Sequence, residues 1–214
     1  MTTAQNEQDS QLKDYIRYLK ERIFFEPQSA TFHYNLGLAY VRKGLIEDAI
    51  SELKQSLECD PTLAQAHVNL GGLYFQQGDL EQCIAANQKA LELDPNLPMA
   101  HSNLGFAYLQ QGDYDKAIDA SKKAIEIMPD LFQAYNTLSV AYLQTDQLAP
   151  SIEASQKILA INESFAPAQY NLAVAYRMAG DLKNARTHYE KAIELGYPID
   201  EELRVEWSES LQEL

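Results

Sequence analysis

An eight-residue phrase recurs through the chain at a fixed interval of 34 residues. It reads HSNLGFAY from His101, and related copies begin at His33, His67, Tyr135 and Gln169. A strict period of this length indicates a repeat protein, in which each unit buries its apolar face against the next unit. The period therefore constrains the fold far more closely than it constrains the function.

Each repeat is predicted to consist of two helices joined by a short turn. Glycine accepts the left-handed backbone that stops a helix, and it stands where the first helix should end in four of the five copies. These residues are Gly44, Gly78, Gly112 and Gly180, with Asp146 in the fourth copy. An aspartate follows three of the glycines, where its side chain can cap the second helix. The capping residues are Asp79, Asp113 and Asp181.

The same frame predicts the organisation of the whole chain. We expect a disordered N-terminus over residues 1–10, an N-terminal cap helix over 11–27 and a C-terminal capping helix over 200–214. Between the caps, five complete units are predicted over 30–63, 64–97, 98–131, 132–165 and 166–199. Caps of this kind cover the apolar ends that stacked repeats leave open.

The spacing of leucine, glycine, tyrosine, alanine and proline within a unit, as in Leu104, Gly105, Tyr108, Ala117 and Pro129, resembles the tetratricopeptide repeat (TPR) family. The match runs from Ala30 to about Ile199. This resemblance implies an all-α, right-handed superhelical solenoid whose first helices line a concave groove. The chain departs from the family pattern where an aromatic residue is expected in the second helix. The middle three units have Asn87, Ser121 and Ser155 at that place.

Composition narrows the partners that the protein can bind. The formal net charge is −14, with 31 acidic and 17 basic residues, which disfavours nucleic acid and anionic membrane surfaces. The first ten residues carry no secretory signal and no stretch resembles a membrane span, so we expect a cytoplasmic protein without membrane insertion. Cys59 and Cys83 are interpreted as free thiols rather than a disulfide.

A column of asparagines is the main candidate for recognition. Asparagine is unfavourable inside a helix, yet it recurs one residue before the leucine that is repeated every 34 residues. These asparagines are Asn35, Asn69, Asn103 and Asn171. The resemblance to TPR proteins implies that these amides face the groove and hydrogen-bond the backbone of a peptide. The alternative is that the amides only bridge neighbouring helices.

Further groove positions follow from helical geometry around that column. They are Val68, Phe75, Phe106, Leu109, Asn136, Leu143, Tyr170 and Arg177. The predicted first helices over 64–77, 98–111 and 132–145 contain no Asp, Glu, Lys or Arg. Such a groove should bind an extended or helical segment that carries apolar anchors. Alternatively, several of these apolar side chains belong to the core between repeats.

Three histidines that align in the repeat, His33, His67 and His101, are interpreted as packing residues. Equivalent positions on packed helices lie about 8–10 Å apart, too far to share one metal ion. No catalytic constellation and no cofactor site is predicted. We therefore expect a non-enzymatic adaptor that binds a protein or peptide. The alternatives are a self-assembling structural protein that forms homo-oligomers and, less favoured, an enzyme with a site hidden in the groove.

Overall fold

The computed structural model describes residues 3–199 together with Arg204 and Trp207, and this part of the chain is helical without strands. The chain forms two compact units, residues 1–103 and 104–214. The all-α fold of paired helices that the repeat predicts is confirmed. The predicted C-terminal capping helix falls mostly outside the described residues.

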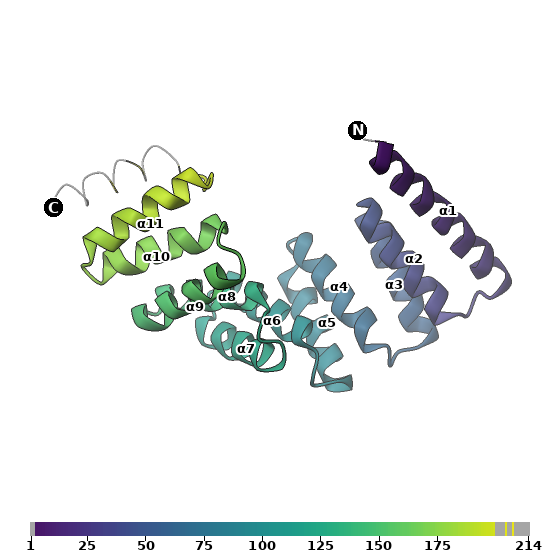
Figure 1. The fold of residues 1–214 in the computed structure, drawn as a ribbon. Helices are drawn as coiled ribbons and strands as arrows, with labels where there is room; N and C mark the ends of the chain where they lie inside the picture. Colours follow the sequence, from purple (N-terminus) through teal and green to yellow (C-terminus); the bar gives the residue numbers. More distant parts are fainter. Residues whose placement is uncertain (1–2, 200–203, 205–206, 208–214) are drawn as a thin grey trace. The chain divides into compact units, whose positions relative to one another are not determined.

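The first unit contains five complete helices and the start of a sixth (Figure 1). They are α1 (Thr3–Phe25), α2 (Ala30–Lys43), α3 (Ile46–Cys59), α4 (Ala64–Gln76), α5 (Leu80–Leu93) and α6 (Pro98–Gln111). Neighbouring helices in the chain pack together, with α2 against α3 and α4 against α5 as the close pairs. Helix α1 lies beside α2.

Helix α1 begins earlier than expected. The sequence predicts disorder over residues 1–10, whereas the helix starts at Thr3. No glycine or proline stands between Thr3 and Ser10, so nothing in this segment stops the helix from extending. Ile16 and Leu19 are buried, which fixes the central part of the helix to the rest of the unit.

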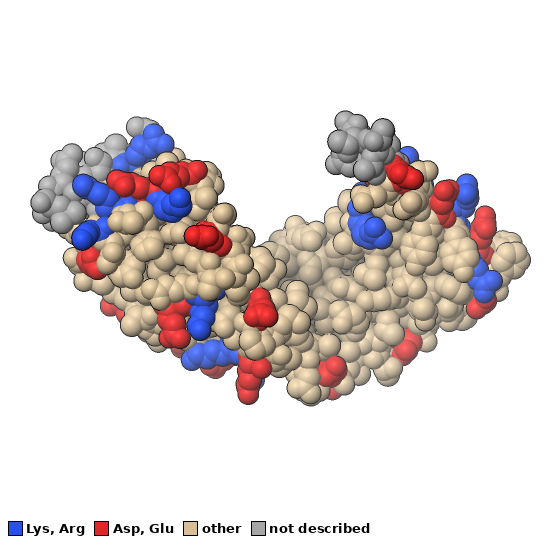
Figure 2. Space-filling model, viewed as in Figure 1, with Lys and Arg blue, Asp and Glu red and all other residues tan. Residues whose placement is uncertain are grey.

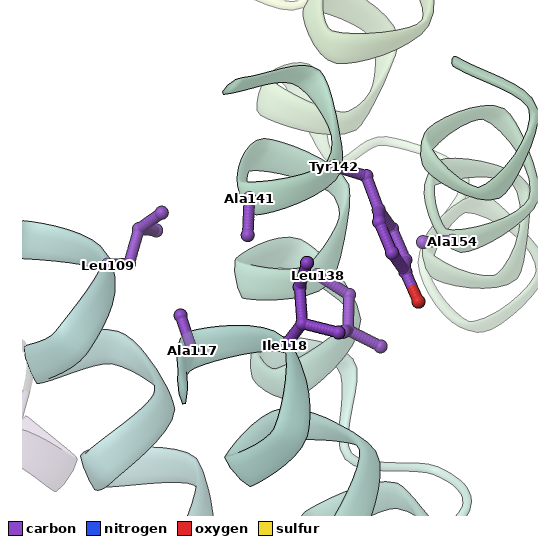
Figure 3. Close-up of a cluster of buried hydrophobic side chains, with 7 residues drawn as sticks. All are labelled: Leu109, Ala117, Ile118, Leu138, Ala141, Tyr142 and Ala154. Carbon is purple, nitrogen blue, oxygen red and sulfur yellow. The ribbon is translucent and has the colours of Figure 1, made fainter. Parts of the chain in front are cut away.

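Up to residue 199, the second unit contains the end of α6 and five further helices, again packed as neighbours. They are α7 (Tyr114–Ile127), α8 (Phe132–Gln144), α9 (Leu148–Ile161), α10 (Ala166–Met178) and α11 (Leu182–Glu194). One cluster of buried apolar residues takes side chains from α6, α7, α8 and α9 in turn. Figure 3 shows Leu138 and Tyr142 of α8 lying between α7 and α9. Tyr142 points toward Ala154, a small residue that leaves room for the ring.

The predicted turn chemistry is confirmed. Gly44, Gly78, Gly112 and Gly180 adopt φ values of 75° to 77°, and Asp146 has a φ of 58° in the fourth turn. The carboxylate of Asp79 accepts a hydrogen bond from the backbone N–H of Gln82 at 3.0 Å. Asp113 and Asp181 cap α7 and α11 in the same way.

The structure also explains the polar residues that replace the aromatic of the second helix. Each of them faces a small residue of the first helix in its own unit. A Cβ atom added to Gly71 would lie 2.1 Å from Nδ2 of Asn87, and one added to Gly105 would lie 2.4 Å from Oγ of Ser121. In the fourth unit, the hydroxyls of Ser139 and Ser155 lie 2.6 Å apart. In each of these three units a polar side chain therefore fills the space opposite the small residue, where the family pattern has an aromatic ring.

Candidate peptide-binding surface

The asparagine column lies on the first helices of the units. Asn35 on α2, Asn69 on α4 and Asn103 on α6 are half-buried, while Asn171 on α10 is buried. Helical spacing places each of them one residue before the leucine that packs into the core, so their side chains lie at the edge of that core. The structure therefore leaves part of the first three amides open to a ligand.

Three of these amides donate a hydrogen bond to another helix. Nδ2 of Asn69 donates to the hydroxyl of Tyr34 at 3.0 Å, and Nδ2 of Asn103 donates to Oδ1 of Asn87 at 3.1 Å. Nδ2 of Asn171 lies 3.5 Å from Oδ1 of Asn136, at the limit of a hydrogen bond. Bridging between helices is thus one role of the column.

The bridges use only part of what an amide offers. A side-chain amide has two N–H donors and a carbonyl with two lone pairs. Within the described part of the chain, the carbonyl oxygens of Asn69 and Asn103 accept no hydrogen bond. Each of these two side chains therefore retains an acceptor and one N–H group for a ligand.

Two of the predicted groove residues lie in the core instead. Val68 is buried together with Ala90 and Ala100, and Leu109 is buried against Ala117 and neighbouring residues of the second unit. Both are too covered to contact a peptide, because a first helix must also pack against its neighbours. We therefore leave Val68 and Leu109 out of the binding surface proposed below.

The remaining apolar positions are partly exposed. Phe75, Phe106, Leu143 and Tyr170 are half-buried, as are the polar Asn136 and Arg177. Tyr170 and Arg177 are engaged within the second unit. The Tyr170 ring stacks on Tyr197 with centroids 4.4 Å apart, and the Arg177 guanidinium lies 4.3 Å from the ring of the fully buried Trp207. This aromatic group covers part of the end of the second unit.

Charge is absent from the first helices of the middle repeats. The residues of α4, α6 and α8 include no Asp, Glu, Lys or Arg. Figure 2 shows the surface over α4 in tan, whereas charged side chains appear on α1 and on the second helices. The surface around Asn69 and Asn103 is therefore neutral and presents amides among apolar groups.

The aligned histidines have a structural role. Nε2 of His33, His67 and His101 each donates to the carbonyl of the proline six residues earlier, at 3.1, 3.3 and 3.0 Å. Each ring thereby ties the start of a first helix to the loop before it. Among the described residues, no three His, Cys, Asp or Glu side chains lie close enough together to hold a metal ion.

The sequence did not single out Asn87 as a partner of the groove. Asn87 is fully buried on α5, donates from Nδ2 to the carbonyl of Cys83 at 2.8 Å and accepts from Asn103. The sequence does contain a signal for this contact, because Gly71 on the first helix stands sixteen residues before Asn87, the spacing at which the two helices of a unit face each other. Burial also raises the pKa of the Cys83 thiol to about 11, so this cysteine is held as a neutral thiol.

These features define a class, the helix-pair repeat protein with a neutral, amide-lined face on its first helices. Family models described as TPR repeat match residues 40–78 and 71–112. Models described as tetratricopeptide repeat match residues 96–164 and 166–196. The chain therefore belongs to the tetratricopeptide repeat family, whose fold is typically a non-catalytic scaffold for protein interactions.

Solved structures of the same family are similar to the chain. A crystal structure of MamA shares 28% identity with a TM-score of 0.68, covering 75% of this chain and 94% of MamA. MamA from Desulfovibrio magneticus RS-1, from residue 41 to the end, shares 26% identity with a TM-score of 0.70, covering 78% and 94%. YrrB, described as a TPR protein with an unusual peptide-binding site, has a TM-score of 0.74 at 18% identity, covering 89% and 97%. A search of curated proteins gave no match.

None of the described helices is both long enough and apolar enough to cross a bilayer.

Proposed function

We propose that the protein is a non-enzymatic adaptor whose first helices bind a peptide segment of a partner protein. The observation that carries this proposal is the pair of half-buried amides, Asn69 and Asn103, each with an unused acceptor on a neutral surface. An amide can pair with both the N–H and the C=O groups of a main chain, whatever its sequence. The surface therefore suits recognition of a backbone.

Partly exposed apolar side chains support the same reading. In the first unit, Phe75 lies one turn and a half beyond Asn69 on α4. In the second unit, Phe106 and Leu143 are partly exposed on α6 and α8. Half-buried side chains of this kind are rigid and can accept an apolar anchor of a ligand. Because the surrounding first helices carry no charge, we propose a segment with apolar anchors and few charged residues.

Other features favour a protein partner in a reducing compartment. The net charge of −14 opposes binding to phosphate backbones. Cys59 and Cys83 are both free thiols, as is common in the cytoplasm, where we propose that the protein acts. The peptide-binding site named for YrrB supports the general idea that this fold can hold a peptide, but at 18% identity it transfers no residue.

The proposal is tested by capturing partners from a lysate of the source organism with three baits. These are the wild type, a groove variant with Asn69→Ala and Phe75→Ala on α4, and a matched variant with Gln156→Ala and Ile127→Ala on the second helices. We expect a protein retained by the wild type and the matched variant to be lost from the groove variant. Purified, that partner should bind the groove variant about 5- to 100-fold more weakly.

Equal retention by all three baits would refute the groove as the working surface. Circular dichroism of each variant must show the same helix content as the wild type. The design avoids Asn103, because removing its amide would leave the buried Oδ1 of Asn87 without its donor.

A second candidate function is self-assembly, which the exposed aromatics at the end of α1 favour. Phe24 and Phe25 are 80% and 74% exposed, with ring centroids 5.3 Å apart. Exposed large apolar groups often mark contact sites. If they join copies of the chain, light scattering should show a mass that rises with concentration in the wild type and not in a Phe24→Ser, Phe25→Ser variant. A strict monomer at high concentration would exclude this function.

A further inference from the structure

Two adjoining hollows lie in the first unit, between the N-terminal half of α1 and the end of α2. One has a volume of about 210 Å³ and is lined by Asp9, Leu12, Lys13, Arg42 and Lys43. The other has a volume of about 370 Å³ and is lined by Gln8, Gln11, Leu12, Tyr15 and Arg42. Leu12 and Arg42 belong to both, so the two hollows form one continuous surface, which we call the α1–α2 surface.

The α1–α2 surface gathers positive charge in a strongly acidic protein. Lys13, Arg42 and Lys43 form no ion pair with any residue that the structure describes. Some other basic residues, among them Arg17, Lys89 and Lys191, pair with a carboxylate on their own helix. Figure 2 shows blue side chains clustered where the end of α2 lies beside the first turns of α1. This charge is available to an outside ligand.

The helix dipole explains only part of this cluster. Arg42 and Lys43 stand in the last turn of α2, where a cation is favoured by the partial negative charge of the helix end. That effect does not account for Lys13, which comes from a different helix and lines the same hollow. The three cations therefore meet through the packing of α1 on α2.

Tyr15 shows that this face is not built for another repeat helix. In the 34-residue frame, Tyr15 corresponds to a position that is small and fully buried in every complete unit. The corresponding residues are Ala49, Cys83, Ala117, Ser151 and Ala185. There, a small side chain allows the first helix of the pair to approach. Tyr15 would hold such a helix away, and its ring is 42% exposed beside the larger hollow.

We propose that the α1–α2 surface binds an acidic peptide segment of a partner protein. Carboxylates of the segment lie near Lys13, Arg42 and Lys43, and an apolar side chain packs against Leu12 and Tyr15. Charge-assisted hydrogen bonds from lysine and arginine to carboxylates supply the attraction. The overall charge of −14 repels a long phosphate chain more strongly than a segment with only a few carboxylates, which favours a short acidic peptide over a nucleic acid. This site is distinct in place and in chemistry from the neutral amides of the first helices.

The probe for this site is a labelled peptide, Glu-Glu-Phe-Glu-Glu, with blocked ends, and its control is Gln-Gln-Phe-Gln-Gln. Binding is followed by fluorescence anisotropy at about 0.05 M ionic strength, where screening is weak. We expect the glutamate peptide to bind and the glutamine peptide not to bind. In the Lys13→Gln, Lys43→Gln variant, affinity should fall about fivefold, as expected for losing two exposed charge contacts.

A matched variant, Lys123→Gln with Lys183→Gln, removes the same charge from α7 and α11 and should bind as the wild type does. Amide chemical shifts should change for residues 8–15 and 41–44. Absence of binding, equal binding of the glutamine peptide, or equal loss in the matched variant would overturn the proposal. Tighter binding of a single-stranded oligonucleotide at the same amides would also overturn it. The Asn69→Ala, Phe75→Ala variant should bind the probe normally, so failure here is distinguishable from failure of the proposed groove.

Discussion

Replacing Gly71 with alanine should destabilise the protein, although alanine is the better helix former. The added Cβ would lie 2.1 Å from Nδ2 and 2.7 Å from Cγ of Asn87, which is fully buried and hydrogen-bonded on both sides. Overpacking at such a contact costs about 1–3 kcal/mol. Alanine in place of glycine in mid-helix returns about 0.5–1 kcal/mol. We therefore expect the free energy of unfolding to fall by up to about 2 kcal/mol.

The neighbouring Gly72 offers a matched control in the same helix. A Cβ at Gly72 would meet only Nδ2 of Asn103, at an ordinary contact distance of 3.9 Å. Gly72→Ala should therefore keep the gain in helix propensity and stabilise the protein by about 0.5–1 kcal/mol. The difference between the two variants, about 1–3 kcal/mol, measures the steric cost alone.

The assay is urea unfolding followed by circular dichroism, with midpoints and slopes compared between variants. A second background, Asn87→Ala, removes the side-chain amide that a Cβ at position 71 would meet. In that background Gly71→Ala should become stabilising, because the obstructing amide is gone. The reasoning is refuted if Gly71→Ala is as stable as Gly72→Ala, or if it destabilises the protein equally in both backgrounds.

Three further outcomes are expected. Asn103→Ala should lower the free energy of unfolding by about 1–3 kcal/mol, because the buried carbonyl of Asn87 loses the amide that donates to it. Asn69→Ala should lower it less in the same urea assay, because the hydroxyl of Tyr34 is half-buried and can turn to water. Burial lowers the pKa of His188 below its ordinary 6.5. The neutral ring therefore stabilises the fold above pH 6.5, and this contribution is lost as the pH falls through the folded-state pKa. The urea midpoints of the wild type and of His188→Gln should converge or cross as the solution is acidified. Cys83, buried and with a pKa of about 11, should resist a thiol reagent at neutral pH until urea unfolds the chain.

The repeat pattern predicts most of the fold because its signals are local. Glycine at the end of a first helix adopts positive φ in every case, and aspartate caps the next helix through its own side chain. These features depend on residues within one turn of each other. The start of α1 at Thr3 does not follow from composition, because the polar residues before Ser10 predict disorder although the segment contains no helix breaker.

The candidate site is less predictable, because helical spacing indicates on which face of a helix a residue lies but not how deeply its side chain is buried. A first helix packs against its own second helix and against neighbouring units, so several of its faces need apolar residues. Leu109 occupies the same position of the repeat as Phe75, yet Leu109 lies in the core whereas Phe75 is partly exposed. Val68, which helical spacing also assigns to the groove, lies in the core as well. Which side chains remain partly exposed depends on contacts between helices that are distant in the sequence.

The polar residues of the middle units connect the groove to the core, and this decides which substitutions can test function. Nδ2 of Asn103 donates to Asn87, and Asn87 donates to the carbonyl of Cys83, so one chain of hydrogen bonds runs from the surface of α6 into α5. Asn69 donates instead to the half-buried hydroxyl of Tyr34. The same residue type in the same repeat position therefore contributes to stability in one unit and mainly to surface chemistry in another. A loss of binding in an Asn103 variant could result from repacking of the core, whereas a loss in an Asn69 variant reports on the surface itself.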